Sequence, residues 1–362
     1  MSKITKNQHF VPRCLLKNFT SEDDVVNIYD SSRDILRNPT SVDRVLAENY
    51  FYDKDNVVEN FLAEHIEAPA SSVLKLFRGE SNEPLDVKSQ IYLLRFIIVQ
   101  LSRTPSALST SLKTFNNVMN EVITQLGQLN NFSEEAINSV EFVLDDPKDI
   151  LRMQTIDSAL HCPLILDLEW HFLINDTDTE YVISDHPVVH YNWYLRNVNA
   201  VDVSSIAKCG TQIFLPLSNR VTLCLYDKQV YKVGKKGTYY TDVTNVKDIH
   251  LLNELQFRNR NSYILFTHRE AADYVKVRCN RISSNSLYKH QFDSTQPSFN
   301  GDEARSLIVQ WQAPYIFSHW FSFSKVKKKY SKRAIYNVYR QPEVVRSHQQ
   351  KIEELRQREK AL

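Results

Sequence analysis

The stretch Gln8-His9-Phe10-Val11-Pro12-Arg13, followed by Leu16 and Phe19, is the strongest indication of how this chain folds. The ends of chains usually fray, so apolar anchors placed this densely predict a segment that docks onto the rest of the protein. The proline suits the first position of a helix, and the amide groups at a helix N-terminus attract anions. We therefore expect Gln8 and His9 to be held in place, either as functional groups or simply as ties for the chain.

Apolar residues at three- and four-residue spacing predict that the chain is mainly helical up to about residue 160. The clearest series runs from Val57 to Phe77 and ends before Gly79, a residue that commonly terminates helices. A short hairpin that begins with a strand at residues 25–29 is expected before this series. Four further helices are expected after it, at residues 86–102, 106–129, 133–144 and 147–160.

Around Pro163 the pattern becomes typical of strands. The expected elements are strands at 164–174, 181–184, 211–217, 221–226 and 263–267, a helix at 248–259, a long loop at 283–301, an aromatic strand at 315–324 and a charged helix from 341. The predicted fold class is α+β, with a helical N-terminal half packed on a mainly antiparallel sheet in the C-terminal half. We expect three regions: 1–160, 161–324 and a basic C-terminal tail, 325–362.

Composition excludes several classes of protein. The 362 residues are 42% hydrophobic and 24% charged, which is ordinary for a globular chain. Only 6 glycines occur and no glycine-rich phosphate loop is present, which disfavours the common nucleotide-binding folds. The 5 scattered cysteines argue against zinc and disulfide frameworks. No apolar run approaches the roughly 20 residues that span a membrane, so we expect a cytoplasmic protein without membrane contact.

The charge is distributed unevenly along the chain. Residues up to 324 carry a net charge of −7, whereas residues 325–362 carry +8. In this tail Lys327, Lys328 and Lys329 lie close to Trp320 and Tyr330 in the sequence, and basic residues between aromatic ones suit the phosphates and bases of nucleic acid. The alternatives are a flexible, solubilising end and a basic face that supports self-association by docking on the acidic body of another copy.

Two glutamates on the first long helix are candidates for chemistry. Glu59 and Glu67 are eight residues apart, which places them about 80° apart on neighbouring faces of a regular helix. Paired carboxylates can bind a divalent metal or transfer protons. Two solvated glutamates without any function would give the same pattern.

Arg103 and Asp185 are the other charged candidates. Arg103 follows Gln100 by one helical turn, and its charge suits either the end of that helix or a bound phosphate. Asp185 lies in Ser184-Asp185-His186-Pro187, after an expected strand, where loops often display catalytic groups. It would hold a metal, orient a histidine such as His9, or only form an Asx turn. Cys14 lacks the signature of a cysteine protease.

In their order along the chain, five short motifs resemble the domain-of-unknown-function family 4238, whose members are mainly bacterial. The motifs are Gln8-His9-Phe10-Val11-Pro12 with Leu16, Asn18 and Phe19; Glu59 with Glu67; Gln100 with Arg103-Thr104-Pro105; Ser184-Asp185-His186-Pro187-Val188; and Leu215-Pro216-Leu217-Ser218, with Asn253 and Gln256 after them. The resemblance covers about residues 3–270. His186 departs from it, because the family usually has asparagine there.

This resemblance implies no established reaction, but it singles out His9, Arg103 and Asp185 as a set. It adds Gln8, Gln100 and Asn253 as candidate binding residues, and it implies a bacterial or phage-associated protein, such as one encoded among defence genes.

Our hypothesis from the sequence is a hydrolase of the nuclease type that acts on phosphate esters. His9 would be a general base or metal ligand, and Arg103 would stabilise charge on a phosphoryl oxygen. Asp185, together with Glu59 or Glu67, would hold a divalent cation in a cleft between the two halves. The alternative is a non-enzymatic module that binds nucleic acid or protein, in which these residues only hold the halves together.

Overall fold

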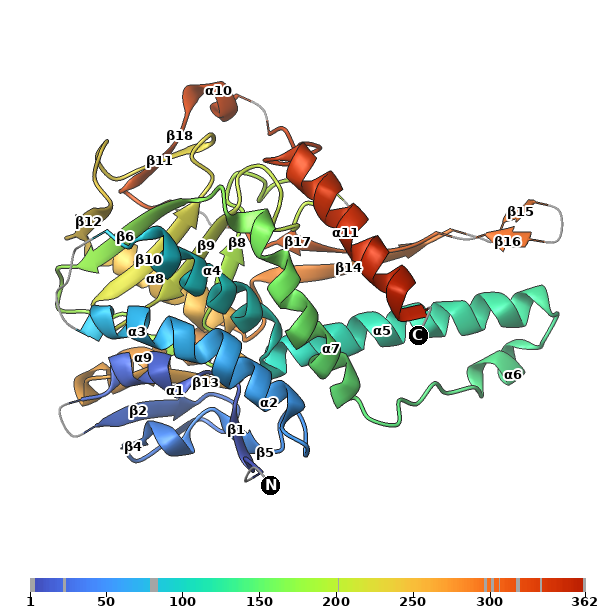
Figure 1. The fold of residues 1–362 in the computed structure, drawn as a ribbon, viewed down its shortest axis with the longest axis horizontal. Helices are drawn as coiled ribbons and strands as arrows, with labels where there is room; N and C mark the ends of the chain where they lie inside the picture. Colours follow the sequence, from blue (N-terminus) through green and yellow to red (C-terminus); the bar gives the residue numbers. More distant parts are fainter. Residues whose placement is uncertain are drawn as a thin grey trace.

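A computed structural model describes most of the chain: residues 4–21, 24–78, 84–200, 202–295, 298–300, 303–305, 307–316, 320–332 and 334–360. It contains two five-stranded sheets and several two-stranded ones (Figure 1). The strands are β1 (Asn7–His9), β2 (Val25–Asp30), β3 (Ile35–Leu36), β4 (Thr40–Ser41), β5 (Ala47–Asn49), β6 (Glu169–Asn175), β7 (Ile183–Ser184), β8 (Val189–Tyr191), β9 (Gln212–Pro216), β10 (Val221–Tyr226), β11 (Tyr231–Val233), β12 (Tyr240–Val243), β13 (Tyr263–Phe266), β14 (Tyr288–Ser294), β15 (Ser298–Asn300), β16 (Glu303–Arg305), β17 (Ile308–Pro314) and β18 (Ser324–Val326).

Helices surround these sheets and connect their strands. The α-helices are α1 (Arg13–Leu16), α2 (Val57–Leu62), α3 (Ala68–Lys75), α4 (Val87–Ser102), α5 (Pro105–Leu129), α6 (Glu134–Asn138), α7 (Lys148–Ser158), α8 (Val246–Asn259), α9 (Ala272–Arg281), α10 (Lys328–Ser331) and α11 (Pro342–Lys360). The shorter helical turns are η1 (Lys17–Phe19), η2 (Val42–Arg44), η3 (Ala63–Glu67), η4 (Leu76–Arg78), η5 (Ala159–Ile165) and η6 (Arg269–Ala271). Of these short turns, η3 is π-helical.

The first sheet has the strand order β12-β6-β10-β9-β8, and all its pairs are antiparallel except β12 with β6. Every residue of β9 and β10 is buried, because helices cover both faces of the sheet. On one face, apolar residues of α3 and α4 form a core with Leu215 and Leu223. On the other face, α8 packs against Leu173 and Phe214. Burial on both faces explains the nearly continuous apolar runs in these strands.

The second sheet joins segments that lie far apart in the sequence, with strand order β3-β2-β13-β7 and β4 paired to β2. Strand β2 lies antiparallel to β13, with Tyr29 opposite Ile264. The α+β class is therefore confirmed. A division into a helical N-terminal half and a sheet-forming C-terminal half is not confirmed, because the N-terminal region contributes strands of its own, and β2 belongs to the same sheet as β13.

Helix α4 begins and ends where local chemistry requires. The Asp86 carboxylate accepts a hydrogen bond from the Ser89 backbone N–H at 2.7 Å, a standard N-cap. The helix ends before Thr104-Pro105, since the residue before a proline disfavours helical backbone. Thr104 then caps α5, which starts with the proline. Helix α5 and the β14–β17 hairpin project in the same direction from the body of the protein (Figure 1).

Four expected elements differ in the structure. The strand expected at 164–174 begins only at residue 169, because residues 164–165 belong to η5. The helix expected at 133–144 is only the five-residue α6, and beyond it Val140 and Val143 are exposed and lack the packing that sustains a short helix. The loop expected at 283–301 contains β14, whose polar residues pair with the distant β17. At the aromatic strand expected over 315–324, residues 320–323 form no strand, and 317–319 lie outside the described residues.

The basic tail is joined to the body at several points. The expected boundary at residue 325 falls inside β18, which pairs with β11. Farther on, the nearly buried Arg340 forms an ion pair with Asp167 at 2.9 Å. Helix α11 contacts η5 through His348, whose ring nitrogen lies 2.9 Å from that of His161. Among the described residues, no helix combines the length and the apolar character needed to cross a bilayer.

Candidate functional site

The N-terminal motif is held by Gln8, which is completely buried in β1. Its amide donates to the Asp53 backbone carbonyl at 2.8 Å, and its carbonyl accepts from the Tyr52 backbone N–H at 2.8 Å. The amide of Gln100 donates to the carbonyl of Phe10, also at 2.8 Å. These bonds satisfy buried backbone groups of the docked segment. Gln8 and Gln100 thus tie the N-terminus down.

Arg103 lies at the centre of this region and is only 1% exposed. Its guanidinium donates to the Tyr52 hydroxyl at 2.9 Å and to the His9 carbonyl at 2.7 Å, and its Nη1 lies 2.8 Å from the Glu67 carboxylate. Burial lowers the pKa of Arg103, but Tyr52 and Glu67 outweigh burial and raise it above its ordinary value. Every nitrogen of the guanidinium faces a protein group, so Arg103 acts on neighbouring residues and not on a ligand in this arrangement.

The π-helical turn η3 changes the relation between Glu59 and Glu67. A π turn accommodates one extra residue, so the two glutamates are separated by about seven regular helical steps, or two full turns. They therefore lie about 20° apart, nearly on one face, and not 80° apart as the regular helix predicted. The pKa of Glu59 is raised to about 7, first by burial and then by the charge of Glu67.

A basic groove lies beside Glu67. It is lined by residues of α1 and η1 on one side and of η3, α3 and η4 on the other. Its volume is about 560 Å³, and its lining includes the cations Arg13, Lys17, Lys75 and Arg78. Glu67 is the only acidic side chain among the described residues that line it. The groove thus places four positive charges next to Glu67, whereas Glu59 interacts with Glu67 but is not among the lining residues.

His9 and Cys14 lie close to the groove. The Nε2 atom of His9 is 3.2 Å from the Val42 carbonyl, and burial lowers the pKa of the ring. Cys14 lines the groove, but burial and the charge of Glu67 raise the pKa of its thiol to about 12. A thiol with so high a pKa is a poor nucleophile at neutral pH.

Asp185 is buried elsewhere and holds a loop. Its carboxylate accepts hydrogen bonds from the backbone N–H groups of Asn261, Ser262 and Tyr263 at 2.7–3.0 Å. Burial raises its pKa to about 6, although the three bonds act in the opposite direction. Among the described residues, no hydrogen bond or ion pair connects Asp185 with His9 or Arg103. The nearest link is indirect, because the next residue, His186, lies 2.6 Å from the Thr104 hydroxyl.

The remaining motif residues also satisfy backbone groups. Asn253 donates to the Glu180 carbonyl at 2.9 Å and accepts from the Val182 N–H at 3.1 Å. Gln256 accepts from Ser184 and donates to the Pro187 carbonyl. Both side chains extend from α8 and hold the segment that leads to Asp185. In this respect Asn253 resembles Gln8 and Gln100 more than a ligand-binding residue.

Metal binding would rest on Glu59 and Glu67 alone. Within the described part of the chain, His, Cys, Asp and Glu side chains form no group of three or more suited to a metal ion. Magnesium needs fewer protein ligands than zinc, since it often uses one or two carboxylates together with substrate phosphates.

Several residues of this region were not predicted from the sequence. Tyr52 has no motif around it, and only the fold brings its hydroxyl to Arg103. The fold brings Lys17 to the groove beside Lys75 and Arg78, which come from a distant segment. The four-residue spacing of Arg13 and Lys17 was a readable signal, since it puts both cations on one helical face.

Comparison with known proteins identifies the family and goes no further. No curated protein and no solved structure matches this chain. The model of one family, described as a protein of unknown function (DUF4238), matches residues 7–270. This range includes the groove, Arg103 with its partners Tyr52 and Glu67, and Asp185 with the loop at residues 261–263. The chain is therefore a member of the DUF4238 family.

Proposed function

We propose that the protein is a hydrolase of the nuclease type that acts on phosphate esters bound in the basic groove. The observation that carries the proposal is the groove itself, in which four cations lie beside Glu67. Phosphate diesters are anions, and lysine and arginine side chains bind them through charge-assisted hydrogen bonds. A nuclease of this kind would suit a bacterial defence role against foreign nucleic acid.

Glu59 is the residue we assign to proton transfer. Its pKa is raised to about 7, near the optimum for a group that must both give and accept a proton at neutral pH. Glu67 lies next to it but is held by Arg103 at 2.8 Å. Two carboxylates in such different surroundings can take different roles, one as an acid and the other as a charged partner.

The other residues have supporting roles. His9 has a lowered pKa, so its ring is neutral at pH 7 and can accept a proton from an attacking water. Arg103 positions Glu67 and the His9 carbonyl from within the protein. The proposal gives no chemical role to Asp185, whose oxygens accept three backbone hydrogen bonds.

A second form of the proposal includes a divalent cation. Glu59 and Glu67 lie on one helical face, and carboxylates with substrate phosphates are the usual ligands of Mg²⁺. The two forms differ in a simple measurement, because a chelator abolishes activity in the second form and not in the first.

The test is hydrolysis of single- and double-stranded DNA and RNA oligonucleotides, with bis(4-nitrophenyl) phosphate as a small probe. We expect Glu59→Gln to lower kcat by about 10²–10⁴, the usual contribution of a general acid or base. Lys17→Ala with Lys75→Ala should mainly raise KM and reduce its dependence on salt. Glu64→Gln is the matched control, because Glu64 lies in the same helical stretch but is exposed, whereas Glu59 is partly buried and interacts with Glu67.

The alternative function is a module that binds nucleic acid without cleaving it. The structural roles of Gln8, Asn253 and Asp185 favour this alternative, since these motif residues hold backbone groups. Salt-dependent binding at the groove with no turnover of any substrate would support it. Activity that Glu59→Gln leaves unchanged would contradict our assignment of the proton-transfer residue.

A further inference from the structure

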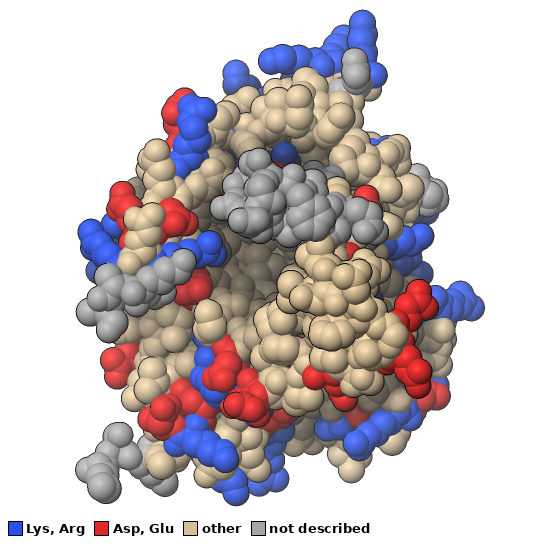
Figure 2. Space-filling model, turned by 90° about the vertical axis from the view of Figure 1, so that its right-hand side faces the viewer, with Lys and Arg blue, Asp and Glu red and all other residues tan. Residues whose placement is uncertain are grey.

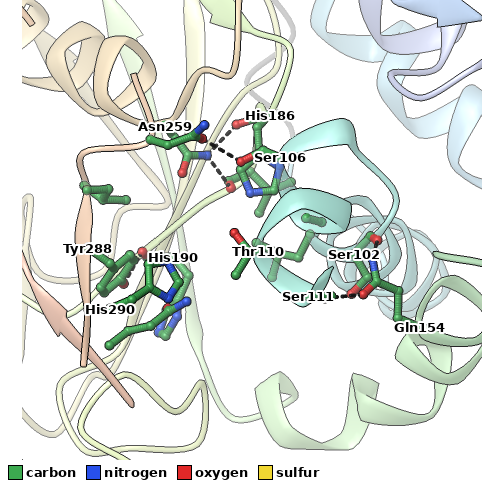
Figure 3. A pocket seen from close by; sticks show the side chains of 16 residues that line it. Ser102, Ser106, Thr110, Ser111, Gln154, His186, His190, Asn259, Tyr288 and His290 are labelled. Carbon is green, nitrogen blue, oxygen red and sulfur yellow. Dashed lines mark hydrogen bonds between the residues drawn. The ribbon is translucent and has the colours of Figure 1, made fainter. Parts of the chain in front are cut away.

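A second cavity lies on the other side of Thr104, where α5 begins. Its volume is about 270 Å³, close to the lower end of the roughly 300–1,000 Å³ typical of small-molecule sites. Helix α5 forms one wall with Ser106 and Thr110, and strands β8 and β14 form the opposite wall with His190 and His290 (Figure 3). The cavity is distinct from the basic groove, with which it shares no lining residue.

The residues that line the cavity are largely polar but uncharged. Among the described residues that form it there is no Lys, Arg, Asp or Glu. The face toward which α5 projects is hollowed, and the visible walls of that hollow are likewise mostly neither basic nor acidic (Figure 2). A charged ligand would lose its hydration here without gaining a counter-charge. The cavity therefore selects for neutral ligands.

Two buried nitrogens have no partner in the described chain. These are Nε2 of His190 and Nδ1 of His290, and each is shielded from solvent. Gln312 lies directly opposite His290 in the β14–β17 pairing and lines the same cavity. An unpaired buried polar atom is costly, so it indicates a missing hydrogen-bond partner.

Several other polar groups of the lining are already engaged and form a rigid frame. The Asn259 amide donates to the carbonyls of His186 and Val188 (Figure 3). The Gln154 amide donates to the Ser102 carbonyl at 2.7 Å. The Tyr288 hydroxyl donates to the His190 carbonyl at 2.5 Å. Because this frame is preorganised, a ligand would bind without first ordering the walls.

We propose that this cavity binds a neutral heteroaromatic base, as a free purine or pyrimidine or as its nucleoside. The His190 and Tyr288 rings, whose centroids lie 6.4 Å apart, both line the cavity, and aromatic side chains favour planar ring ligands. A base also carries ring nitrogens and exocyclic groups that both donate and accept hydrogen bonds at its edge. Those groups match the Thr110 hydroxyl and the Gln312 amide, and the His190 and His290 side chains line the same cavity.

The histidines have the protonation state that this ligand requires. Burial lowers the pKa of His190 to about 3 and that of His186 to about 4. Burial and the charge of Lys113 lower the pKa of His290. All three rings are therefore neutral at pH 7, and each neutral imidazole offers one donor and one acceptor. The inference does not rest on hydrolysis in the groove.

The test is saturation-transfer NMR and calorimetry with adenosine, guanosine, cytidine and uridine at millimolar concentration. We expect at least one nucleoside to bind, with the strongest saturation transfer on the protons of the base. Thr110→Leu, which removes a hydroxyl and fills space, and His290→Ala should each weaken binding about tenfold or more. His250→Ala is the matched control, because His250 is a half-buried histidine on α8 that does not line the cavity.

Three outcomes would overturn the proposal. They are the absence of binding by all four nucleosides, equal binding of ribose or glucose, and binding that the cavity variants leave unchanged. Thermal melting of both variants shows whether weaker binding comes from a changed cavity or from unfolding of the protein. If His290→Ala unfolds, Thr110→Leu on α5 still tests the proposal. A nuclease activity without nucleoside binding would refute this inference alone.

Discussion

Arg103 and Asp185 lie in two different sequence motifs and are equally buried, yet the structure uses their charges differently. Arg103 faces another charge, Glu67, which itself reaches the basic groove. Asp185 accepts its hydrogen bonds from the backbone N–H groups of residues 261–263. Arg103 thus contacts a residue that lines the groove, where a ligand can bind, whereas Asp185 stabilises a loop. Conspicuous residues of one family can therefore have separate roles, and the geometry distinguishes them.

The largest expected effect is the loss of the Arg103 charge. Arg103→Met leaves Glu67 without its partner and removes donors from Tyr52 and the His9 carbonyl. We expect the free energy of unfolding to fall by about 3–5 kcal/mol, as when one member of a buried ion pair is removed. Urea denaturation measures this. Arg13→Ala is the control, because its pair with Asp43 is exposed and should contribute less than about 1 kcal/mol.

Asp185→Asn should produce a smaller effect of another kind. An asparagine can accept fewer of the three backbone hydrogen bonds, so we expect the free energy of unfolding to fall by about 1–3 kcal/mol. The catalytic constant of the folded variant should not change, since Asp185 lies outside the groove. If a stable Asp185→Asn variant has lost hydrolytic activity, Asp185 belongs to the functional site and does more than hold a loop.

Glu59 should make stability depend on pH. Its pKa is about 7 in the folded protein and about 4.3 in an unfolded chain, so the folded state holds the proton more tightly. The stability that Glu59 contributes is therefore present below about pH 4 and is lost as the pH rises to about 7. Denaturation at about pH 5 and about pH 8 should show a smaller difference for Glu59→Gln than for the wild type. Glu64→Gln should retain the wild-type difference.

The smallest effect is expected from the tail. Lys328 and Lys329 are exposed on α10, whereas the amine of Lys327 donates to the Lys228 carbonyl at 2.5 Å. If the tail adds to nucleic-acid binding, replacing Lys327, Lys328 and Lys329 by alanine should lower affinity and reduce the salt slope by up to about three. The stability should change little. If this triple variant loses more nucleic-acid affinity than the variant with Lys17→Ala and Lys75→Ala, the main binding surface is the tail and not the groove.

Much of the local structure could be predicted from the sequence. Helices at 86–102 and 106–129 appear as α4 and α5, because their boundary at Thr104-Pro105 depends on cap and proline chemistry alone. Strand β14 was not predicted, since its mostly polar residues become a strand only through pairing with β17. Pairing of β2 with β13 was also outside reach, as it joins residues more than 230 positions apart.

The sequence by itself determined the periodicity of the helices, the docking of the Gln8-His9 segment and membership of the family. These depend on short-range patterns, on apolar anchors and on the order of motifs. Only the tertiary structure decided which charges meet. The π turn aligns Glu59 with Glu67, the fold gathers Lys17 and Lys75 in one groove, and a loop surrounds Asp185 with backbone donors. The reason is physical, because the energy of a charge depends on the groups that surround it in space.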